Sequence, residues 1–216
     1  KKIKNKASFN INRIDAIEKD VKHDVIAFLT NVAEYVGDDS RFIHKGVTSS
    51  DIIDTAFSIQ LKQSCNIIKK ELKDLINNLK NKALEYKNLA CIGRSHGIFA
   101  EPTTFGLKML SRFCEFKRHY QRLCDAEKQI SICSISGAVG TYANIDPAVE
   151  KYVAKKLGLK LEDVSTQIIP RDRHAFLFST LALIASSIEN LAIEIRHLQR
   201  SEVREVEELF SKDQKG

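Results

Sequence analysis

A seam of aliphatic residues near the end of the chain is the feature that most constrains its fold. Its members follow one another in steps of four and three, at Leu177, Leu181, Ile184, Ile188, Leu191, Ile195 and Leu198. This spacing places all of them on one face of an α-helix, as in a coiled coil. The seam therefore predicts a helix of roughly forty residues whose apolar face packs against other long helices.

Other stretches predict further helices. Residues 51–87 contain neither Gly nor Pro, and a helical spacing relates the apolar side chains of Ile68, Leu72, Leu75 and Leu79. A long helix is expected over residues 105–132 and a shorter one over residues 146–158. Asparagines near the start of the chain are the expected caps of a helix over residues 10–35.

These elements predict an all-α fold, an elongated bundle of long helices whose apolar faces continue into partner subunits. Residues 1–50 are expected to be the remainder of an N-terminal helical domain. Residues 51–216 are expected to form a central long-helix bundle domain that is incomplete at its C-terminus. Hydrophobic residues make up 43% of the chain, which is enough for a sizeable core.

Charge and cysteine content exclude several classes of protein. The 34 Lys and Arg exceed the 28 Asp and Glu by a net charge of +6, which is spread along the chain. We interpret this as a solvated face or a field that gathers an anionic substrate, and expect no nucleic-acid partner. Five cysteines without a Cys-x-x-Cys pair predict reduced thiols in a cytoplasmic protein with no metal site. No stretch approaches the roughly 18 uncharged apolar residues of a membrane span, so no membrane is expected.

Two short islands carry the candidate chemistry. They are His44-Lys45-Gly46-Val47-Thr48-Ser49-Ser50-Asp51, and Gly93-Arg94-Ser95-His96-Gly97 with its continuation Ala100-Glu101-Pro102-Thr103-Thr104. Each places a histidine, which titrates near neutrality, among small residues just ahead of a helical pattern. The free N–H groups at a helix start bind anions. The two islands therefore predict a shared pocket for an anionic substrate.

The histidines also have structural interpretations. His96 lies on no apolar stripe, which favours a role in acid–base catalysis. His23 lies within a helical pattern and is either a partly buried helix residue or a site residue; the adjacent Asp24 cannot share its helix face. His44 has the same two interpretations. The histidines interpreted as structural are His119, His174 and His197.

Taken together, the motifs of this chain resemble those of the adenylosuccinate lyases, a family of the fumarase/aspartase superfamily. The resemblance covers essentially the whole chain. Besides the two islands, its motifs are Ser8-Phe9-Asn10-Ile11-Asn12-Arg13, Lys22-His23-Asp24, the Ser136-Gly137-Ala138-Val139-Gly140-Thr141-Tyr142-Ala143-Asn144 loop, Arg171-Asp172-Arg173-His174-Ala175 and Leu198-Gln199-Arg200-Ser201-Glu202.

The resemblance implies a β-elimination that breaks a C–N bond and releases fumarate. The substrates would be adenylosuccinate, which gives AMP, and the succinyl-aminoimidazole carboxamide ribotide of purine biosynthesis. A base removes a proton beside a carboxylate, and a general acid protonates the leaving nitrogen. The resemblance implies no metal or redox cofactor. It also implies a homotetramer whose helical core is shared and whose sites are built from several subunits.

The resemblance assigns roles to individual residues. His96 matches the general acid, and His23 matches a second site histidine that supports it. Thr48 and Ser49 match contacts to a substrate carboxylate, at a helix terminus where capping and ligand binding can coexist. Gln167 matches a further substrate contact.

Three more residues belong to the implied substrate site. His44 matches a histidine near the phosphate end, and Lys22 and Asp24 flank His23 in its motif. Lys22 stands where many family members have Arg, which keeps the charge but loses the bidentate fork. Ser95 stands where many have Thr and keeps the hydroxyl.

Three parts of the family pattern are missing. The family's catalytic base is a serine in a mobile Ser-Ser-x-Met-Pro-x-Lys-x-Asn loop, which the sequence does not contain. An N-terminal Arg-Tyr pair and a C-terminal helical domain are missing too. We therefore expect these residues alone to be inactive. Two alternatives stay open: another lyase of the superfamily, of the argininosuccinate or fumarate type, and a helical scaffold without catalysis.

Overall fold

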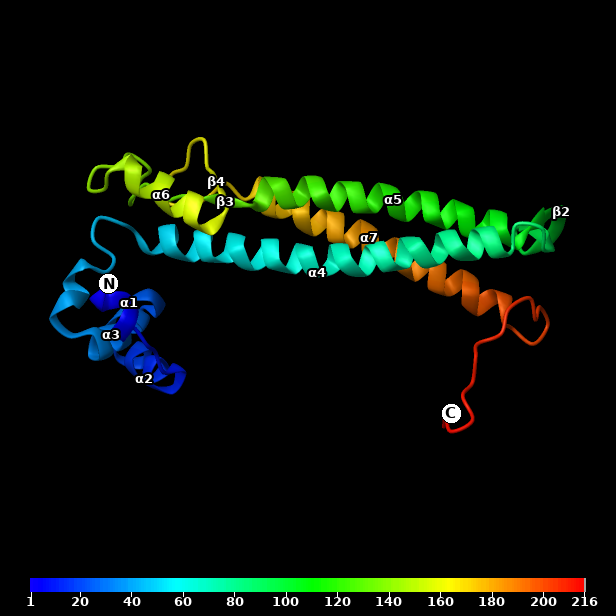
Figure 1. Ribbon diagram of the computed structural model, residues 1–216, viewed down its shortest axis with the longest axis horizontal. Coiled ribbons are helices and arrows are strands. Elements are labelled where there is room, and N and C mark those ends of the chain that lie inside the picture. The colour runs from blue at the N-terminus through cyan, green and yellow to red at the C-terminus, as the bar shows by residue number, and fades with distance from the viewer. Residues whose placement is uncertain (216) are drawn as a thin grey trace. The chain divides into compact units, whose positions relative to one another are not determined.

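A computed structural model describes residues 1–215; Gly216, the last residue of the predicted central domain, lies outside them. The described chain is mostly helical, which confirms the predicted fold class, and it adds two small two-stranded sheets (Figure 1). The chain divides into two compact units. Unit 1 comprises Lys1–Ile59 and Ser131–Pro170, and unit 2 comprises Gln60–Ile130 and Arg171–Gly216. The domain boundary after residue 50 stays a prediction.

Unit 1 begins with short helices: α1 (Lys2–Lys6), α2 (Ile11–Val21), α3 (Asp24–Val36) and the 3-10 helix η1 (Gly37–Phe42). Asn10 caps α2, as expected, by accepting a hydrogen bond from the N–H of Arg13 at 3.0 Å. The single helix predicted over residues 10–35 is wrong. The chain leaves the helical conformation at Lys22, where φ is 55° and α2 ends in a left-handed cap.

The rest of unit 1 combines the first turns of α4 (Ser49–Glu85) with α6 (Pro147–Leu157) and a small parallel sheet. In this sheet β3 (Ile132–Cys133) pairs with β4 (Lys160–Leu161). Asp146 caps α6 through the N–H of Ala148 at 2.8 Å, and Gly158 ends it at φ 64°, as predicted. These elements pack around a small apolar cluster. Its buried members are Cys133, Ile135, Ala154 and Leu159.

Unit 2 contains the rest of α4, α5 (Phe105–Ile130) and α7 (Asp172–Leu198). The bounds of α4 and α5 agree closely with the predicted helices over residues 51–87 and 105–132. Figure 1 shows α5 and α7 side by side. The three helices share one apolar core, in which Phe116 and Leu123 have no exposed surface.

Helix α7 is shorter than expected, with 27 residues. Every second member of its seam is buried within this chain: Leu177, Ile184, Leu191 and Leu198. Ile188 and Ile195 stay 46% and 42% exposed. Within residues 1–215, α7 is also the one helix whose length and composition would allow it to cross a membrane, although core helices of soluble proteins pass the same criterion.

A β-hairpin follows α4 and was not predicted. Strand β1 (Ala90–Ser95) pairs antiparallel with β2 (Ile98–Thr104), and the register is shifted between Ile92 and Arg94. The second island therefore forms a hairpin instead of the start of a helix. Gly106 follows at the start of α5, where a Cβ atom would lie 2.5 Å from the carbonyl oxygen of Ala83, so only glycine allows α4 and α5 to approach so closely.

Candidate active site

The first island forms a tight loop that leads into α4 in unit 1. Thr48 is the cap residue, and Asp51 reaches back to accept the Thr48 N–H at 2.9 Å, while the Asp51 N–H bonds to the Thr48 carbonyl. The bond to the Asp51 side chain is one half of a capping box; in the other half the Asp51 N–H bonds to the backbone carbonyl of Thr48 and not to its hydroxyl. The N–H of Thr48 is therefore already bonded, which corrects the expectation that it would be free for an anion. The hydroxyls of Thr48 and Ser49, both half-buried, remain the candidate ligand contacts.

Asp51 also joins this loop to the Ser134–Gly140 segment. Its Oδ1 accepts the N–H of Ser136 at 3.1 Å, and its Oδ2 accepts the N–H of Gly137 at 3.0 Å. The carboxylate is 2% exposed, so three backbone N–H groups replace its water shell. The close approach continues at Gly46, where a Cβ atom would lie 2.1 Å from the carbonyl oxygen of Asn144.

A second buried carboxylate stabilises the other side of the Ser134–Gly140 segment. Glu150, which is 3% exposed, accepts the N–H of Ile135 at 2.9 Å and the hydroxyl of Tyr142 at 2.7 Å. Burial and the Glu150 carboxylate raise the pKa of Tyr142 to about 12, so its hydroxyl remains a proton donor. Tyr142 itself adopts φ 56°.

Three serine hydroxyls converge between this segment and the turn that carries Gln167. The Oγ atom of Ser165 lies 2.7 Å from that of Ser134 and 2.8 Å from that of Ser136. A Cβ atom on Gly140 would lie 2.1 Å from the Ser165 carbonyl oxygen, so backbones also touch here. Gln167, two residues further on, is exposed. Unit 1 thus brings the segments of Thr48, Ser49 and Gln167 together around one loop.

His44 precedes this start of α4 in the same loop. It adopts φ 65°, a conformation that non-glycine residues rarely take. Its Nε2 atom is buried, and no hydrogen-bond partner for it occurs among residues 1–215. A strained, half-buried imidazole with an unused ring nitrogen is typical of a functional residue more than of a structural one.

The Lys22-His23-Asp24 motif forms the turn between α2 and α3. All three side chains are exposed, and His23 is the cap of α3 instead of a residue within a helix, which corrects the sequence-based interpretation. Its Nδ1 atom lies 3.4 Å from the N–H of Ile26 and 3.3 Å from Oδ1 of Asp24. Neutral His23 accepts from Ile26 at this atom, whereas protonated His23 donates to Asp24.

His96 occupies the tip of the β1–β2 hairpin in unit 2. His96 and Gly97 have φ values of 53° and 77°, the signature of a two-residue type I′ turn. This turn matches the twist of the flanking strands and leaves the imidazole exposed. On strand β1, Arg94 forms an ion pair with Glu205 from the segment that follows α7, with 2.5 Å between Nη2 and Oε1. The Arg94 guanidinium also lies over an aromatic ring, 5.3 Å from the centre of Phe99.

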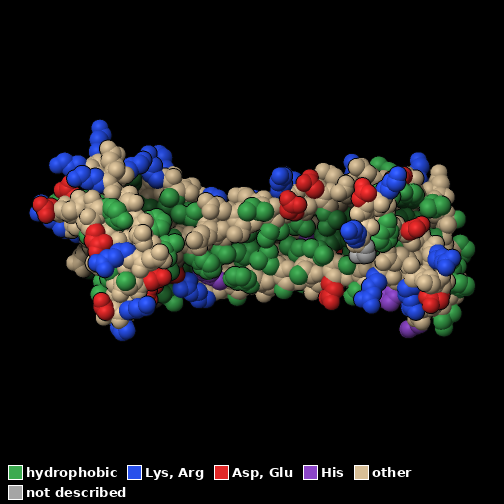
Figure 2. All heavy atoms as spheres, turned by 90° about the horizontal axis from the view of Figure 1, so that it is seen from below, with side chains coloured by type: hydrophobic (Ala, Val, Ile, Leu, Met, Phe, Trp, Pro, Cys, Tyr) green, Lys and Arg blue, Asp and Glu red, His purple; other side chains and the backbone are tan. Residues whose placement is uncertain are grey.

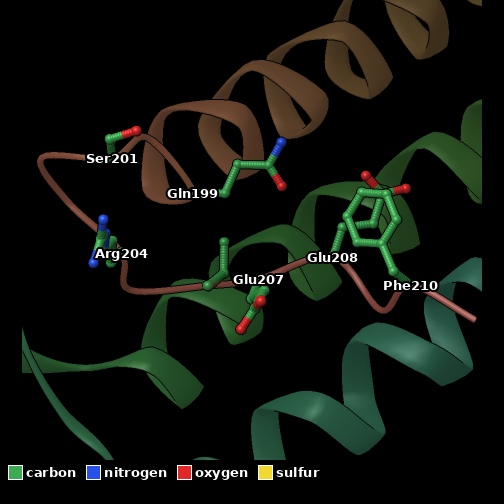
Figure 3. A pocket seen from close by; sticks show the side chains of 7 residues that line it. Gln199, Ser201, Arg204, Glu207, Glu208 and Phe210 are labelled. Atoms are coloured by element: carbon green, nitrogen blue, oxygen red, sulfur yellow. The ribbon is translucent and has the colours of Figure 1, made fainter. Parts of the chain in front are cut away.

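Of the pockets at the end of α7 in unit 2, two exceed 400 Å³. One, of about 430 Å³, is lined by Gly97 of the hairpin turn together with Arg94, Lys108, Glu194 and Arg200. The second, of about 440 Å³, is enclosed by the segment after α7, and Figure 3 shows Gln199, Glu207 and Phe210 among its walls. In the first pocket Lys108 is already paired with Glu194 at 3.2 Å, so its charge is largely balanced.

Of the predicted site residues, His96 belongs to unit 2 and all the others belong to unit 1. Asp51, Glu150 and the three clustered serines were not predicted. Asp51 had a usable signal, because Thr-Ser-Ser-Asp is a capping-box sequence. Glu150 had none, since it lies within an ordinary amphipathic helix. Among residues 1–215 no cluster of three or more His, Cys, Asp or Glu could bind a metal ion.

Comparison with known proteins assigns this combination of a long-helix fold and histidine motifs to a class. Residues 2–216 match the model of a lyase family, and the chain belongs to that family. The fold agrees: a fumarate lyase from Mesorhizobium sp. superimposes with a TM-score of 0.85 and 26% identity, over 91% of this chain and 47% of that one. A 3-carboxy-cis,cis-muconate lactonizing enzyme from Pseudomonas putida gives 0.84 and 25%, over 91% and 46%.

Within the family, the similarity to adenylosuccinate lyases is much higher. The chain is 54% identical to that of Bacillus subtilis over all of its 216 residues, and 53% identical to that of Synechocystis sp. over 214. The enzyme of Staphylococcus saprophyticus is 49% identical over 216 residues. Each alignment covers 50% of the relative, so the chain spans about half the length of the curated relatives it matches.

Proposed function

We propose that the complete protein containing this chain is an adenylosuccinate lyase, which releases fumarate from adenylosuccinate and from the succinyl-aminoimidazole carboxamide ribotide. The observation that carries the proposal is 54% identity, over the whole chain, to a relative of that name. The motifs of the two histidine islands support it. No metal or redox cofactor is needed for a β-elimination that moves one proton off carbon and another onto nitrogen.

His96 is the proposed general acid. As the C–N bond breaks, its electron pair goes to the nitrogen, and the imidazolium donates the proton that completes the leaving group. The type I′ turn supports this role because it presents the ring on a short, rigid hairpin and leaves it exposed. Histidine suits the step, since its pKa near neutrality allows both protonation states. His23, whose Nδ1 lies close to both the Ile26 N–H and the Asp24 carboxylate, is the proposed supporting histidine.

The other candidate residues are proposed to bind the substrate. Thr48 and Ser49 offer hydroxyls at the N-terminus of α4, where the helix dipole stabilises a carboxylate. Gln167 offers an exposed amide at the rim of the same loop cluster. His44 offers its unused Nε2 to a phosphate oxygen. Lys22 and Asp24 flank His23 and complete the set.

We further propose that the protein is a cytoplasmic homotetramer that binds neither nucleic acid nor membranes. Figure 2 shows hydrophobic side chains gathered over the long helices on one face, and α7 contributes exposed Phe178, Leu183, Ile188 and Ile195. A partner helix would cover these side chains, of which Ile188 and Ile195 belong to the seam. Membrane insertion is the less suitable explanation of the apolar α7, because Glu194 forms an ion pair and Ser187 lies in a polar network with α5.

The test measures fumarate release by the complete protein from adenylosuccinate and, in parallel, from argininosuccinate. We expect turnover of adenylosuccinate alone, and a fall in kcat of about 10²–10⁴-fold in His96→Ala. His197→Ala is the matched control, since it removes another exposed histidine from unit 2. Light scattering on the same sample gives the oligomeric state.

Each of the other results would reject part of the proposal. Fumarate released from argininosuccinate alone would keep the family and change the substrate. An unaffected His96→Ala enzyme would remove His96 from catalysis. A folded protein that turns over neither substrate would favour the non-catalytic scaffold.

A further inference from the structure

The buried face of the first turns of α4 is polar, which is unusual for a helix of this length. Asp51, Asp54, Thr55 and Ser58 are exposed by 5% or less. Their positions follow the i, i+3, i+4, i+7 pattern that in most helices belongs to the apolar face. Further along the same helix the buried residues become apolar, with Cys65, Leu72 and Leu79. The change marks where α4 stops contacting loops and starts contacting helices.

Three members of this polar face bond directly to irregular backbone. Asp51 accepts N–H groups from Thr48, Ser136 and Gly137, as described above. Asp54 accepts the N–H of Ile169 at 2.8 Å. Thr55 lies 3.3 Å from both the N and the O atom of Ser134. These bonds end on the segments of Thr48 and Gln167, or on the Ser134–Gly140 segment that contacts both.

We propose that Asp51 and Asp54 are positioning residues for the substrate site. Asp51 fixes Thr48 and the Ser134–Gly140 segment relative to each other. Asp54 fixes Ile169, two residues from Gln167, and so orients the exposed amide of that glutamine. Neither carboxylate is exposed enough to reach the substrate itself. The proposal rests on the proposed function for the identity of the substrate, but its structural part does not depend on it.

The chemistry of the segments explains why carboxylates are used. The loops have few ladder partners, so their buried N–H groups need acceptors elsewhere. An ionised carboxylate accepts several N–H groups at once, and such charge-assisted bonds are stronger than neutral ones. Its negative charge is balanced by those N–H dipoles and, for Asp51, by its place in the first turn of α4. A neutral amide side chain would present its NH2 group to one of the same donors.

A role in folding alone would predict a different outcome from a role in positioning. If the carboxylates only stabilise unit 1, their loss lowers the melting temperature and leaves the kinetic constants of the folded enzyme unchanged. If they position the binding residues, the folded variant has a raised KM and a nearly unchanged kcat, because His96 and its hairpin belong to unit 2.

The experiment compares Asp51→Asn and Asp54→Asn with the wild type in the complete protein. We expect KM for adenylosuccinate to rise roughly tenfold in each, as the replacement of a charge-assisted bond by a weaker neutral one implies. We expect kcat to change much less. Hydrogen exchange followed by mass spectrometry should show faster exchange over residues 131–142 in Asp51→Asn and over residues 164–170 in Asp54→Asn.

Ser58→Ala is the matched control. Ser58 lies on the same buried face with no exposed surface, and its Oγ atom has no hydrogen-bond partner among residues 1–215. This variant should keep the wild-type KM and exchange rates. If Asp51→Asn does not assemble, Asp54→Asn decides the question through the Gln167 segment alone.

Two results would overturn the proposal. One is a folded Asp51→Asn or Asp54→Asn protein with wild-type KM; the other is unchanged exchange in the segment that each carboxylate contacts. Wild-type protein that does not cleave adenylosuccinate would instead overturn the proposed function. In that case the exchange measurement still decides whether the two carboxylates fix the loops.

Discussion

The two units of this chain are stabilised in different ways. Unit 2 consists mainly of long helices, which satisfy their own backbone hydrogen bonds and need only side-chain packing to associate. Its core is accordingly apolar, with Phe116 and Leu123 fully buried between α4, α5 and α7. Unit 1 contains loops whose backbone groups have no helix or sheet to pair with. There the buried carboxylates of Asp51 and Glu150 add to a small apolar cluster by accepting the N–H groups of the loops.

The difference has a functional meaning. Candidate binding residues need irregular backbone, because loops can direct several hydroxyls and amides at one ligand. Such backbone stays fixed only if its N–H groups have strong acceptors within the protein. In the proposed enzyme, the long-helix unit provides stability, an assembly surface and the hairpin of His96, whereas the loop unit provides the other candidate binding residues. We therefore expect substitutions in unit 2 to act through volume and substitutions in unit 1 to act through geometry.

The largest effect is expected from Phe116→Ala in unit 2. The ring has no exposed surface and contacts the shared core of three helices, so its removal leaves a cavity. The free energy of unfolding should fall by about 3–5 kcal/mol. Urea unfolding of the complete protein at fixed concentration measures this, with the exposed Phe210→Ala as control. A loss below about 1 kcal/mol would mean that the core is not packed as described.

A smaller effect is expected from Gly46→Ala in unit 1. The residue has φ 79°, and a Cβ atom would meet the Asn144 carbonyl oxygen at 2.1 Å. Backbone strain and this clash together should lower stability by roughly 2–4 kcal/mol. Gly97→Ala is the control, because Gly97 has φ 77° with nothing within 4 Å of the added carbon, and should cost only the strain of roughly 1–2 kcal/mol. Equal losses in the two variants would show that the Gly46–Asn144 contact is not tight.

The sequence predicts unit 2 better than unit 1, and the reason is physical. Periodicity reports the apolar face of a long helix directly, so α4 and α5 were predicted with nearly correct bounds. It fails where one residue ends a helix without Gly or Pro, as Lys22 does in a left-handed conformation. It also fails for the short hairpin around His96, because six- and seven-residue strands carry little periodic signal.

The residues of the candidate site also differ in how far the sequence predicts them. Motif resemblance selects exposed candidates such as His96 and Gln167, because the types of these residues match the family pattern. It does not select Asp54 or the three serines, whose hydrogen bonds join segments that only the fold brings together. A buried polar face on α4 looks, in sequence, like an ordinary solvated helix surface. Only the hydrogen bonds of Asp51 and Asp54 reveal that it faces inward.

The smallest effect is expected at a polar network within the apolar core of unit 2. His119, which is 5% exposed, lies with Nε2 at 2.8 Å from the Ser187 hydroxyl, and that hydroxyl donates to Glu115 at 2.6 Å. Since Ser187 donates to Glu115, it accepts from Nε2–H, and Nδ1 faces Arg122 at 3.4 Å. The histidine is therefore neutral in this arrangement. Burial first, and then the charge of Arg122, lower its pKa, while Glu115 opposes them.

The sign of the pH dependence follows from this pKa. In the unfolded chain His119 takes up a proton as the pH falls below its ordinary value of 6.5, whereas in the folded chain it stays neutral to lower pH. The unfolded state then binds more protons, so stability is fully present above that value and decreases as the pH falls below it. The pKa of Glu115 is also lowered: burial would raise it, but hydrogen bonds from Ser187 and Arg112 outweigh burial. Its contribution is lost only at lower pH.

Thermal unfolding between pH 7 and pH 5, in the range where histidine titrates, tests this assignment. His119→Gln can still donate to Ser187 but does not titrate, so the decrease in melting temperature on acidification should be shallower in this variant than in the wild type. His197→Gln, which replaces an exposed histidine of the same unit, should keep the wild-type slope. If both variants retain that slope, the acid sensitivity arises elsewhere, and the network then stabilises the α5–α7 contact without responding to pH.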